Sequence, residues 1–231
     1  MSVKDMLFGV AAGIGSGGGG GGGEVEALSV TENGTYTAPT GKAYSPVTVN
    51  VGGDPALPAE YQRVEYLHND GNCWCEISAQ PIYGDNISVS FSLDADAPAG
   101  ENGVVGTSAS SGAWEIYTQS NAIYFWGAVS GTTVSNIERD TKYTVVGTFS
   151  NYSGYASNFL WGRYRNDTKP YYGKMYACDV YCQRGQTKLY SARLVPCYRK
   201  ADNVPGFYDL ANSVFYTNAG TGTFGIGPDV N

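Results

Sequence analysis

The chain has 231 residues, enough for one large or two small domains, and 42% of them are hydrophobic. Its 32 glycines, 19 tyrosines and 8 phenylalanines, set against only 15% charged residues, favour strands and turns over helices. We therefore predict an all-β fold. A net charge of −7 argues against nucleic acid or an anionic membrane as a partner of the whole molecule.

Residues 1–16 hold a short apolar segment. It is interrupted by glycine, lacks a convincing cleavage site and has only about ten residues, so it predicts neither a signal peptide nor a membrane span. We interpret it as an anchor that becomes ordered on a partner protein. The alternative, a frayed terminus that binds nothing, stays open. The side chains expected to make the attachment are Met6, Leu7, Phe8, Val10 and Ile14.

A linker, a small unit and a hinge follow the apolar segment. Residues 17–23 are consecutive glycines, which have no side chain to bury and predict a flexible linker. Residues 24–51 contain turn signals and end in the alternating run Val47–Val51, typical of a small β unit. Because so short a unit cannot bury a stable core alone, it should either pack on the main domain or self-associate, and we favour self-association as a trimeric collar or stalk. Residues 52–57 form a second hinge.

Residues 58–231 show short apolar runs separated by turn clusters, the pattern of a β-sandwich. The expected strands are Arg63–Leu67, Trp74–Ser78, Ile87–Leu93, Gly103–Thr107, Trp114–Thr118, Ala122–Phe125, Tyr143–Phe149, Phe159–Gly162, Gly173–Cys182, Lys188–Pro196, Gly206–Leu210 and Val214–Tyr216. Pro196 is expected at a strand end or on a sheet edge, because proline donates no hydrogen bond to a ladder. Gly220, Gly222 and Gly225 are expected to follow a path with positive φ.

The charges are unevenly distributed within this domain. Residues 54–138 carry one basic and eleven acidic side chains, whereas residues 139–200 carry eleven basic and three acidic ones. We favour the interpretation that strands of the two halves interleave and neutralise each other. The alternative is a basic face that meets an acidic virion or cell-wall polymer.

The five cysteines lack the spacing of a zinc site, and no signal peptide suggests a disulfide-rich secreted fold. We expect buried free thiols. A contact between Cys178 and Cys197 on neighbouring strands is left open.

Three stretches resemble a known family: Leu57–Leu67, Tyr172–Tyr181 and the closing run Leu194–Phe224, which ends in Phe215-Tyr-Thr-Asn-Ala-Gly-Thr-Gly-Thr-Phe224. They are similar to the opening, a central strand and the closing signature of concanavalin A-like (laminin-G-like) jelly-roll domains in minor structural proteins of phages and prophages of gut Firmicutes. The resemblance implies a jelly-roll sandwich in a virion protein, a head fibre, decoration or tail-tip receptor-binding protein. Such a protein is assembled in the bacterial cytoplasm and displayed on the particle.

The same fold class includes glycoside hydrolases, which need two carboxylates flanking the scissile bond. The laminarinase-type family carries them on one strand as Glu-x-Asp-x-x-Glu. Here Glu115 stands alone, with Tyr117 and with Gln119 or Ser120 at the partner positions. This departure removes the catalytic pair, and a glycoside hydrolase is the least favoured function.

Other chemistry also lacks residues to carry it. His68 is the only histidine, and no motif places an aspartate or nucleophile beside it for a Ser-His-Asp or Cys-His site. Asp94 and Asp96 form at most a weak calcium ligand set, and a solvated turn is the favoured interpretation. We expect no catalytic residue, no metal and no cofactor.

Binding is better supported, because aromatic side chains can stack on sugar rings while planar polar groups hold the hydroxyls. The function we expect is adhesion to host surface or glycans, in a homotrimer attached to other virion proteins and strengthened by avidity. The alternative is a purely structural protein that cements neighbouring subunits. The candidate ligand-binding residues are Trp114, Tyr117, Trp126, Tyr152, Tyr155 and Arg165.

Overall fold

The computed structural model describes residues 55–79, 81–107, 114–150, 159–164, 169–185 and 187–230, together with four short strands nearer the N-terminus. Contacts divide the chain into two units, Met1–Pro55 and Ala56–Asn231. The sequence placed the start of the main domain at residue 58. No helix in the described part of the chain is long and apolar enough to cross a bilayer.

The first unit contains two short antiparallel pairs. β1 (Leu7–Phe8) pairs with β2 (Leu28–Ser29), and β3 (Gly34–Tyr36) pairs with β4 (Val47–Val49). A strand is therefore present within the predicted alternating run Val47–Val51. The anchor residues Met6, Val10 and Ile14 and the glycine run lie outside the described residues.

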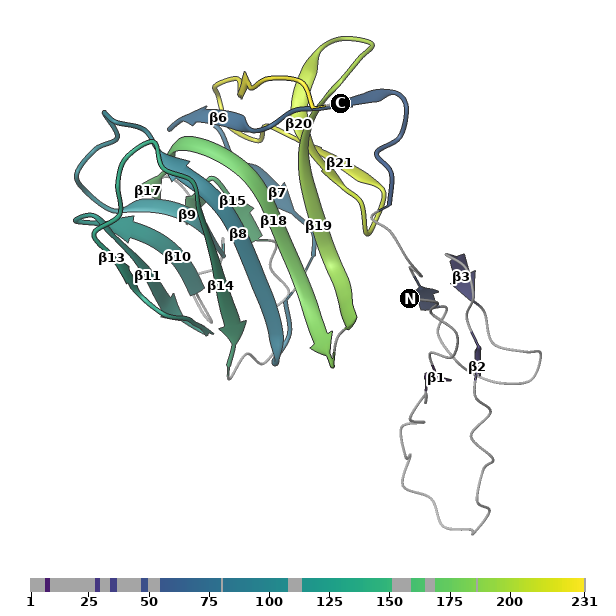
Figure 1. The fold of residues 1–231 in the computed structure, drawn as a ribbon. Helices are drawn as coiled ribbons and strands as arrows, with labels where there is room; N and C mark the ends of the chain where they lie inside the picture. The colour runs from purple at the N-terminus through teal and green to yellow at the C-terminus, as the bar shows by residue number, and fades with distance from the viewer. Residues whose placement is uncertain are drawn as a thin grey trace. The chain divides into compact units, whose positions relative to one another are not determined.

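The second unit is a sandwich of two antiparallel sheets, which confirms the all-β prediction for the described residues (Figure 1). The six-stranded sheet has the order β13-β11-β10-β9-β15-β7. Its strands are β7 (Cys75–Ile77), β9 (Asn102–Thr107), β10 (Trp114–Gln119), β11 (Ala122–Gly127), β13 (Val134–Ser135) and β15 (Phe159–Trp161). A separate two-stranded hairpin is formed by β16 (Arg163–Tyr164) and β17 (Lys169–Pro170).

The ten-stranded sheet has the main order β12-β14-β8-β18-β19-β20-β21; in addition β6 pairs with β18, β5 pairs with β19, and β22 pairs with β6. The main strands are β12 (Val129–Ser130), β14 (Tyr143–Phe149), β8 (Asp85–Leu93), β18 (Tyr172–Arg184), β19 (Thr187–Arg199), β20 (Val204–Asp209) and β21 (Val214–Thr217). The further strands are β5 (Tyr61–Arg63), β6 (Leu67–Asp70) and β22 (Gly225–Ile226).

The core between the sheets is built from alternate residues of each strand, as the period of two requires. In β8 the inward residues are Ile87, Val89, Phe91 and Leu93, all buried. Aromatic side chains fill much of the space between the sheets. Trp114 of β10 meets Phe149 edge to face, with ring centroids 4.9 Å apart.

The long strands β18 and β19 separate along their length. They pair from Cys178 opposite Leu194 to the turn between them; beyond this point β6 pairs with β18 and β5 pairs with β19. The single predicted strand Arg63–Leu67 is therefore wrong. The chain must cross from β19 to β18 within that stretch, so it forms the end of β5, a bridge at Val64 and the start of β6.

Pro196 lies inside β19, which has β18 on one side and β20 on the other, so the prediction of a strand end or a sheet edge was wrong. Its carbonyl accepts a hydrogen bond from the Val64 N–H at 3.0 Å, so its backbone faces the point where β19 changes neighbour from β18 to β5. Proline has no N–H, so Pro196 accepts this hydrogen bond but cannot donate the second one that another residue could make. The position tolerates proline because only that single donated bond is missing.

The three glycines of the C-terminal run do not have the backbone conformation that the sequence predicted. Gly220, Gly222 and Gly225 do not have positive φ. Instead, the first two allow a close approach: a Cβ on Gly220 would lie 2.1 Å from the Asn72 carbonyl oxygen, and one on Gly222 would lie 2.9 Å from Cys73 Sγ. The glycines are needed for space and not for backbone conformation.

Candidate functional site

The outer face of the six-stranded sheet carries polar and aromatic side chains in register. Trp114 points into the core, so its neighbour Glu115 lies on the opposite face of β10. Glu115 is paired across the strands with Trp126, and Tyr117 is paired with Tyr124. Directly paired residues share a face and contact each other. We call these four residues, with Glu101 and Lys169 described next, the Glu115 face.

The β16–β17 hairpin brings a cation onto this face. Lys169 Nζ lies 2.5 Å from Glu101 Oε2 and 3.2 Å from Glu115 Oε2. The Glu115 side chain is only 1% exposed, whereas those of Lys169 and Glu101 are 26% and 33% exposed. Burial acts to lower the pKa of Lys169, but hydrogen bonds and charge from the two glutamates outweigh it and raise the pKa above its ordinary value. Lys169 is therefore held in its charged form.

Two tyrosines stack beside the ion pairs. The rings of Tyr117 and Tyr124 have centroids 5.3 Å apart and an interplanar angle of 23°. Lys169 Nζ lies 5.4 Å from the centre of the Tyr117 ring, within the range of a cation–π contact. Burial, followed by the negative charges of Glu101 and Glu115, raises the pKa of Tyr117. Its hydroxyl therefore stays protonated and can donate a hydrogen bond.

The predicted ligand-binding residues fall into three groups. Trp126 is 48% exposed and Tyr117 is half-buried, and both lie on the Glu115 face. Trp114 is 1% exposed and belongs to the core, so it offers no surface to a ligand. Tyr152, Tyr155 and Arg165 lie outside the described residues.

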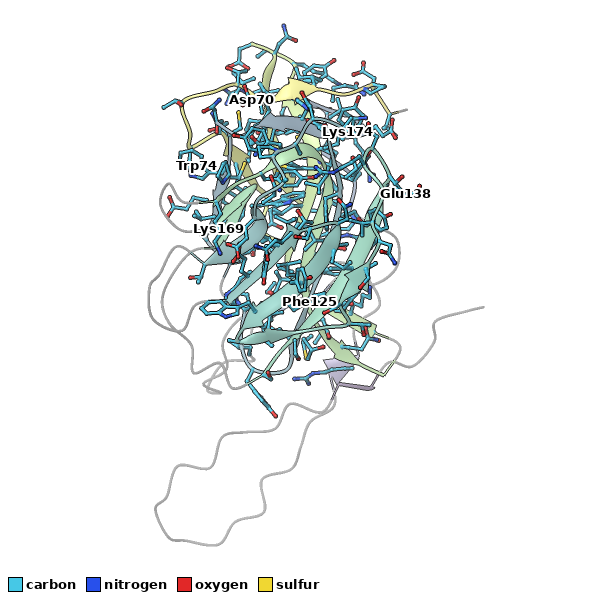
Figure 2. All side chains as sticks on the ribbon, turned by 90° about the vertical axis from the view of Figure 1, so that its left-hand side faces the viewer. Asp70, Trp74, Phe125, Glu138, Lys169 and Lys174 are labelled. Carbon is cyan, nitrogen blue, oxygen red and sulfur yellow. The ribbon has the colours of Figure 1, made fainter. Side chains whose placement is uncertain are left out.

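Sequence reasoning missed Glu101 and Lys169. Glu101 immediately precedes β9 and Lys169 begins β17, and no motif links them to Glu115. The only sequence signal was the division of charge along the chain. At this face a lysine of the basic half does pair with two glutamates of the acidic half, as the favoured interpretation expected. Figure 2 shows Lys169 on one side of the domain and Lys174, from the larger sheet, on the other.

His68 has an acidic partner that the sequence did not indicate. Its Nε2 lies 2.7 Å from Asp94 Oδ2, joining β6 to the turn after β8. Among the described residues no hydroxyl or thiol hydrogen-bonds the other imidazole nitrogen, so the pair lacks the nucleophile of a triad there. The described part of the chain also holds no group of three or more His, Cys, Asp or Glu residues suited to a metal ion.

All five cysteines are free thiols, and four of them are buried. Cys178 and Cys197 do not form a disulfide. Burial raises the pKa of the Cys73 thiol to about 11 and that of the Cys197 thiol to about 12. The prediction of buried free thiols is confirmed for these four, while Cys182 is partly exposed.

The fold and the Glu115 face define the second unit as an all-β sandwich with an aromatic and charged surface on its smaller sheet. Comparisons with protein-family models, with curated proteins and with solved structures find no match to the chain.

Proposed function

We propose that residues 56–231 form a carbohydrate-binding domain of a bacteriophage virion protein, with the Glu115 face as the binding surface. The domain would be a concanavalin A-like jelly roll, as the resemblance of the sequence suggests. The two facing antiparallel sheets support this architecture. The binding domain would attach the particle to glycans on the host surface.

The observation that carries the proposal is the exposed ring of Trp126 beside a charged group of side chains. A sugar ring has an apolar face that packs on an aromatic ring, and hydroxyls at its edge that need hydrogen-bond partners. Trp126 offers the aromatic surface, and Tyr117, Glu101 and Lys169 offer donors and acceptors on the same face. The ion pairs with Lys169 hold these polar groups in place before a ligand arrives, which reduces the entropy lost on binding.

The context of a phage particle rests on the sequence resemblance and on the organisation of the chain. A segment containing Met6, Leu7, Phe8, Val10 and Ile14 would bind other virion proteins, and the glycine run would separate it from the binding domain. A trimer would present three weak sites together, and effective concentration would turn their low affinity into stable attachment.

A purely structural role is the first alternative. In that case the Glu115 face would contact a neighbouring virion subunit and bind no host ligand. Exposure of Trp126 in the single chain is expected under both functions, so binding has to be measured.

Glycoside hydrolysis is a second candidate, because Glu101 and Glu115 both contact Lys169 Nζ and so lie close together. Retaining enzymes place two carboxylates a few ångströms apart. However, Glu115 is only 1% exposed and is held by Lys169, so it would have to move to reach a glycosidic bond. Cleavage of host polysaccharide by the purified protein, abolished by Glu115→Gln, would establish this function instead.

The experiment that tests the proposal measures binding of the purified full chain to an array of neutral bacterial glycans, with affinities from titration calorimetry. We expect Trp126→Ala to weaken binding by roughly tenfold or more, because the ring supplies the stacking surface. Tyr83→Ala is the matched control, since Tyr83 is 71% exposed but lies in the turn before β8 and not on the Glu115 face.

Two results would reject the proposal: no glycan binds the wild-type chain, or Trp126→Ala binds as tightly as Tyr83→Ala. The place on the particle is tested separately by electron microscopy of virions labelled with an antibody against residues 58–231. Labelling at the capsid or at the tail tip would support display on the particle, and no labelling would contradict it.

A further inference from the structure

The outer face of the larger sheet carries tyrosine rings that are covered by cations. Lys142 Nζ lies 4.3 Å from the centre of the Tyr176 ring, and Lys174 Nζ lies 5.1 Å from that of Tyr66. The two rings meet edge to face with centroids 5.6 Å apart. Lys174 is paired with Ser92 beside the buried pair of Met175 and Phe91, so it points away from the core.

A second cluster of the same kind lies further along β18 and β19. Lys188 Nζ lies 4.2 Å from the centre of the Tyr181 ring, and the Arg193 guanidinium lies 4.7 Å from that of Tyr190. Tyr181 and Tyr190 are cross-strand partners with centroids 5.8 Å apart. At about 3.3 Å per residue, the five steps from Tyr176 to Tyr181 place the clusters roughly 15 Å apart along one strand.

This face is positive although the chain as a whole is negative. Four cations belong to the two clusters, and the one acidic side chain on the outer face of β8, β14, β18 and β19 is Asp179, opposite Arg193. Asp94, which follows β8, is the acidic neighbour of the first cluster, and its Oδ2 lies 2.7 Å from Nε2 of His68, the cross-strand partner of Lys174. Among the described residues Lys142, Lys174 and Lys188 form no ion pair. Their charges are therefore available to a partner.

The clusters favour recognition of charge over stacking. A nucleic acid base needs a bare aromatic face, but here each of the four rings has a cation above it, and Tyr181 is only 5% exposed. Beside the clusters β8 and β14 present small polar side chains, including the hydrogen-bonded pair Ser90 and Thr144. Such a surface suits a ligand with spaced negative charges and hydroxyl groups between them.

We propose that the outer face of β18 and β19 binds a linear phosphodiester polymer whose repeating unit is a polyol, with one stretch of phosphates at each cation–tyrosine cluster. Lysine and arginine bind phosphate oxygens by charge-assisted hydrogen bonds, and the neighbouring hydroxyl side chains contact the polyol. The Tyr rings keep the lysines in place on the sheet. This proposal does not depend on glycan binding, because the Glu115 face belongs to the other sheet.

The test uses the purified full chain and a synthetic poly(glycerol phosphate) chain, with binding measured by fluorescence anisotropy at several salt concentrations. The variant Lys142→Gln/Lys174→Gln/Lys188→Gln removes three charges and keeps a polar side chain at each position. We expect it to weaken binding by roughly tenfold or more, and to reduce the slope of log affinity against log salt by about 2, since each phosphate contact releases counterions. The control is Arg63→Gln/Arg199→Gln/Lys200→Gln, which removes the same charge at the end of β19 that pairs with β5, beyond both clusters.

The proposal is supported if the first variant loses affinity and slope while the control keeps most of both. It is overturned if the wild-type chain does not bind the polymer, or if the two variants weaken binding equally. An oligothymidylate with the same number of phosphates is measured in parallel. Tighter binding of this oligonucleotide than of the polyol polymer would replace the proposed ligand by a single-stranded nucleic acid. Trp126→Ala is expected to bind the polymer normally, which separates this site from the glycan site.

Discussion

Lys169 Nζ lies 3.2 Å from Glu115 Oε2, although the two residues are 54 positions apart in the sequence. Glu115 is almost completely buried, while Lys169 keeps a second carboxylate partner in Glu101. The pair is therefore asymmetric. Removing the lysine takes away the cation beside a buried carboxylate, whereas neutralising Glu115 leaves the lysine paired.

We expect Lys169→Met to destabilise the domain by about 2–4 kcal/mol and Glu115→Gln by roughly 1 kcal/mol, because a buried charge without its counter-ion costs more than a neutral amide. Urea unfolding followed by tryptophan fluorescence measures both. All four tryptophans lie between residues 74 and 161, so the signal reports on the second unit alone. A larger loss in Glu115→Gln than in Lys169→Met would contradict the assigned asymmetry.

Asp209 closes the turn between β20 and β21 from a fully buried position. Its Oδ1 accepts hydrogen bonds from the backbone N–H groups of Arg193, Ala211 and Asn212. We expect Asp209→Ala to lower the free energy of unfolding by about 2–4 kcal/mol, since it leaves buried donors unsatisfied. The control is Asp202→Ala: Asp202 forms an exposed ion pair with Arg199, and its loss should change the urea midpoint little.

Substituting Gly220 tests whether this position requires glycine because there is no room for a side chain or because of its backbone conformation. A Cβ at this position would lie 2.1 Å from the Asn72 carbonyl and 2.5 Å from the Trp74 ring, and the φ of Gly220 is one that alanine can adopt. We expect Gly220→Ala to cost about 1–3 kcal/mol by overpacking. Gly100→Ala, where a Cβ meets nothing within 4 Å, should leave the stability nearly unchanged. Equal effects of the two substitutions would show that the close contact does not matter.

The sequence predicted those features that depend on local pattern. The predicted strand Ile87–Leu93 lies within β8, where its alternating residues face the core. The predicted strands Lys188–Pro196 and Gly206–Leu210 overlap β19 and β20. The predicted strand Val214–Tyr216 likewise lies within β21. In each case the physical cause lies within a few residues of the strand itself.

Features set by contacts across the fold were not predictable in this way. The break inside Arg63–Leu67 exists because β18 and β19 separate, and nothing within those five residues indicates it. The burial of Trp114 depends on Phe149 and Phe159, and the ion pairs of Lys169 depend on a hairpin that packs against β9. For the candidate site, the pattern identified Trp126 and Tyr117 as aromatic candidates, whereas Glu101 and Lys169 join them only through the packing of the β16–β17 hairpin against the sheet.

Cys73 links the burial of the thiols to a measurable dependence of stability on pH. Burial, together with the charge of Asp70, raises its pKa from an ordinary value of 9.0 to about 11, because the thiolate is disfavoured in the folded chain. Below pH 9 the thiol is neutral in both states and the stabilising contribution is fully present. As the pH rises from 9 towards 11, the unfolded thiol ionises first and that contribution is lost.

We therefore expect the urea midpoint to fall across this range, and to fall less in Cys73→Ala, measured between pH 8 and pH 11. The remaining fall in the variant reports the other buried thiols, Cys75, Cys178 and Cys197, together with tyrosines such as Tyr171, because burial raises the pKa values of all these groups. An identical pH profile in the variant and the wild type would show that Cys73 ionises as easily in the folded chain as in the unfolded one.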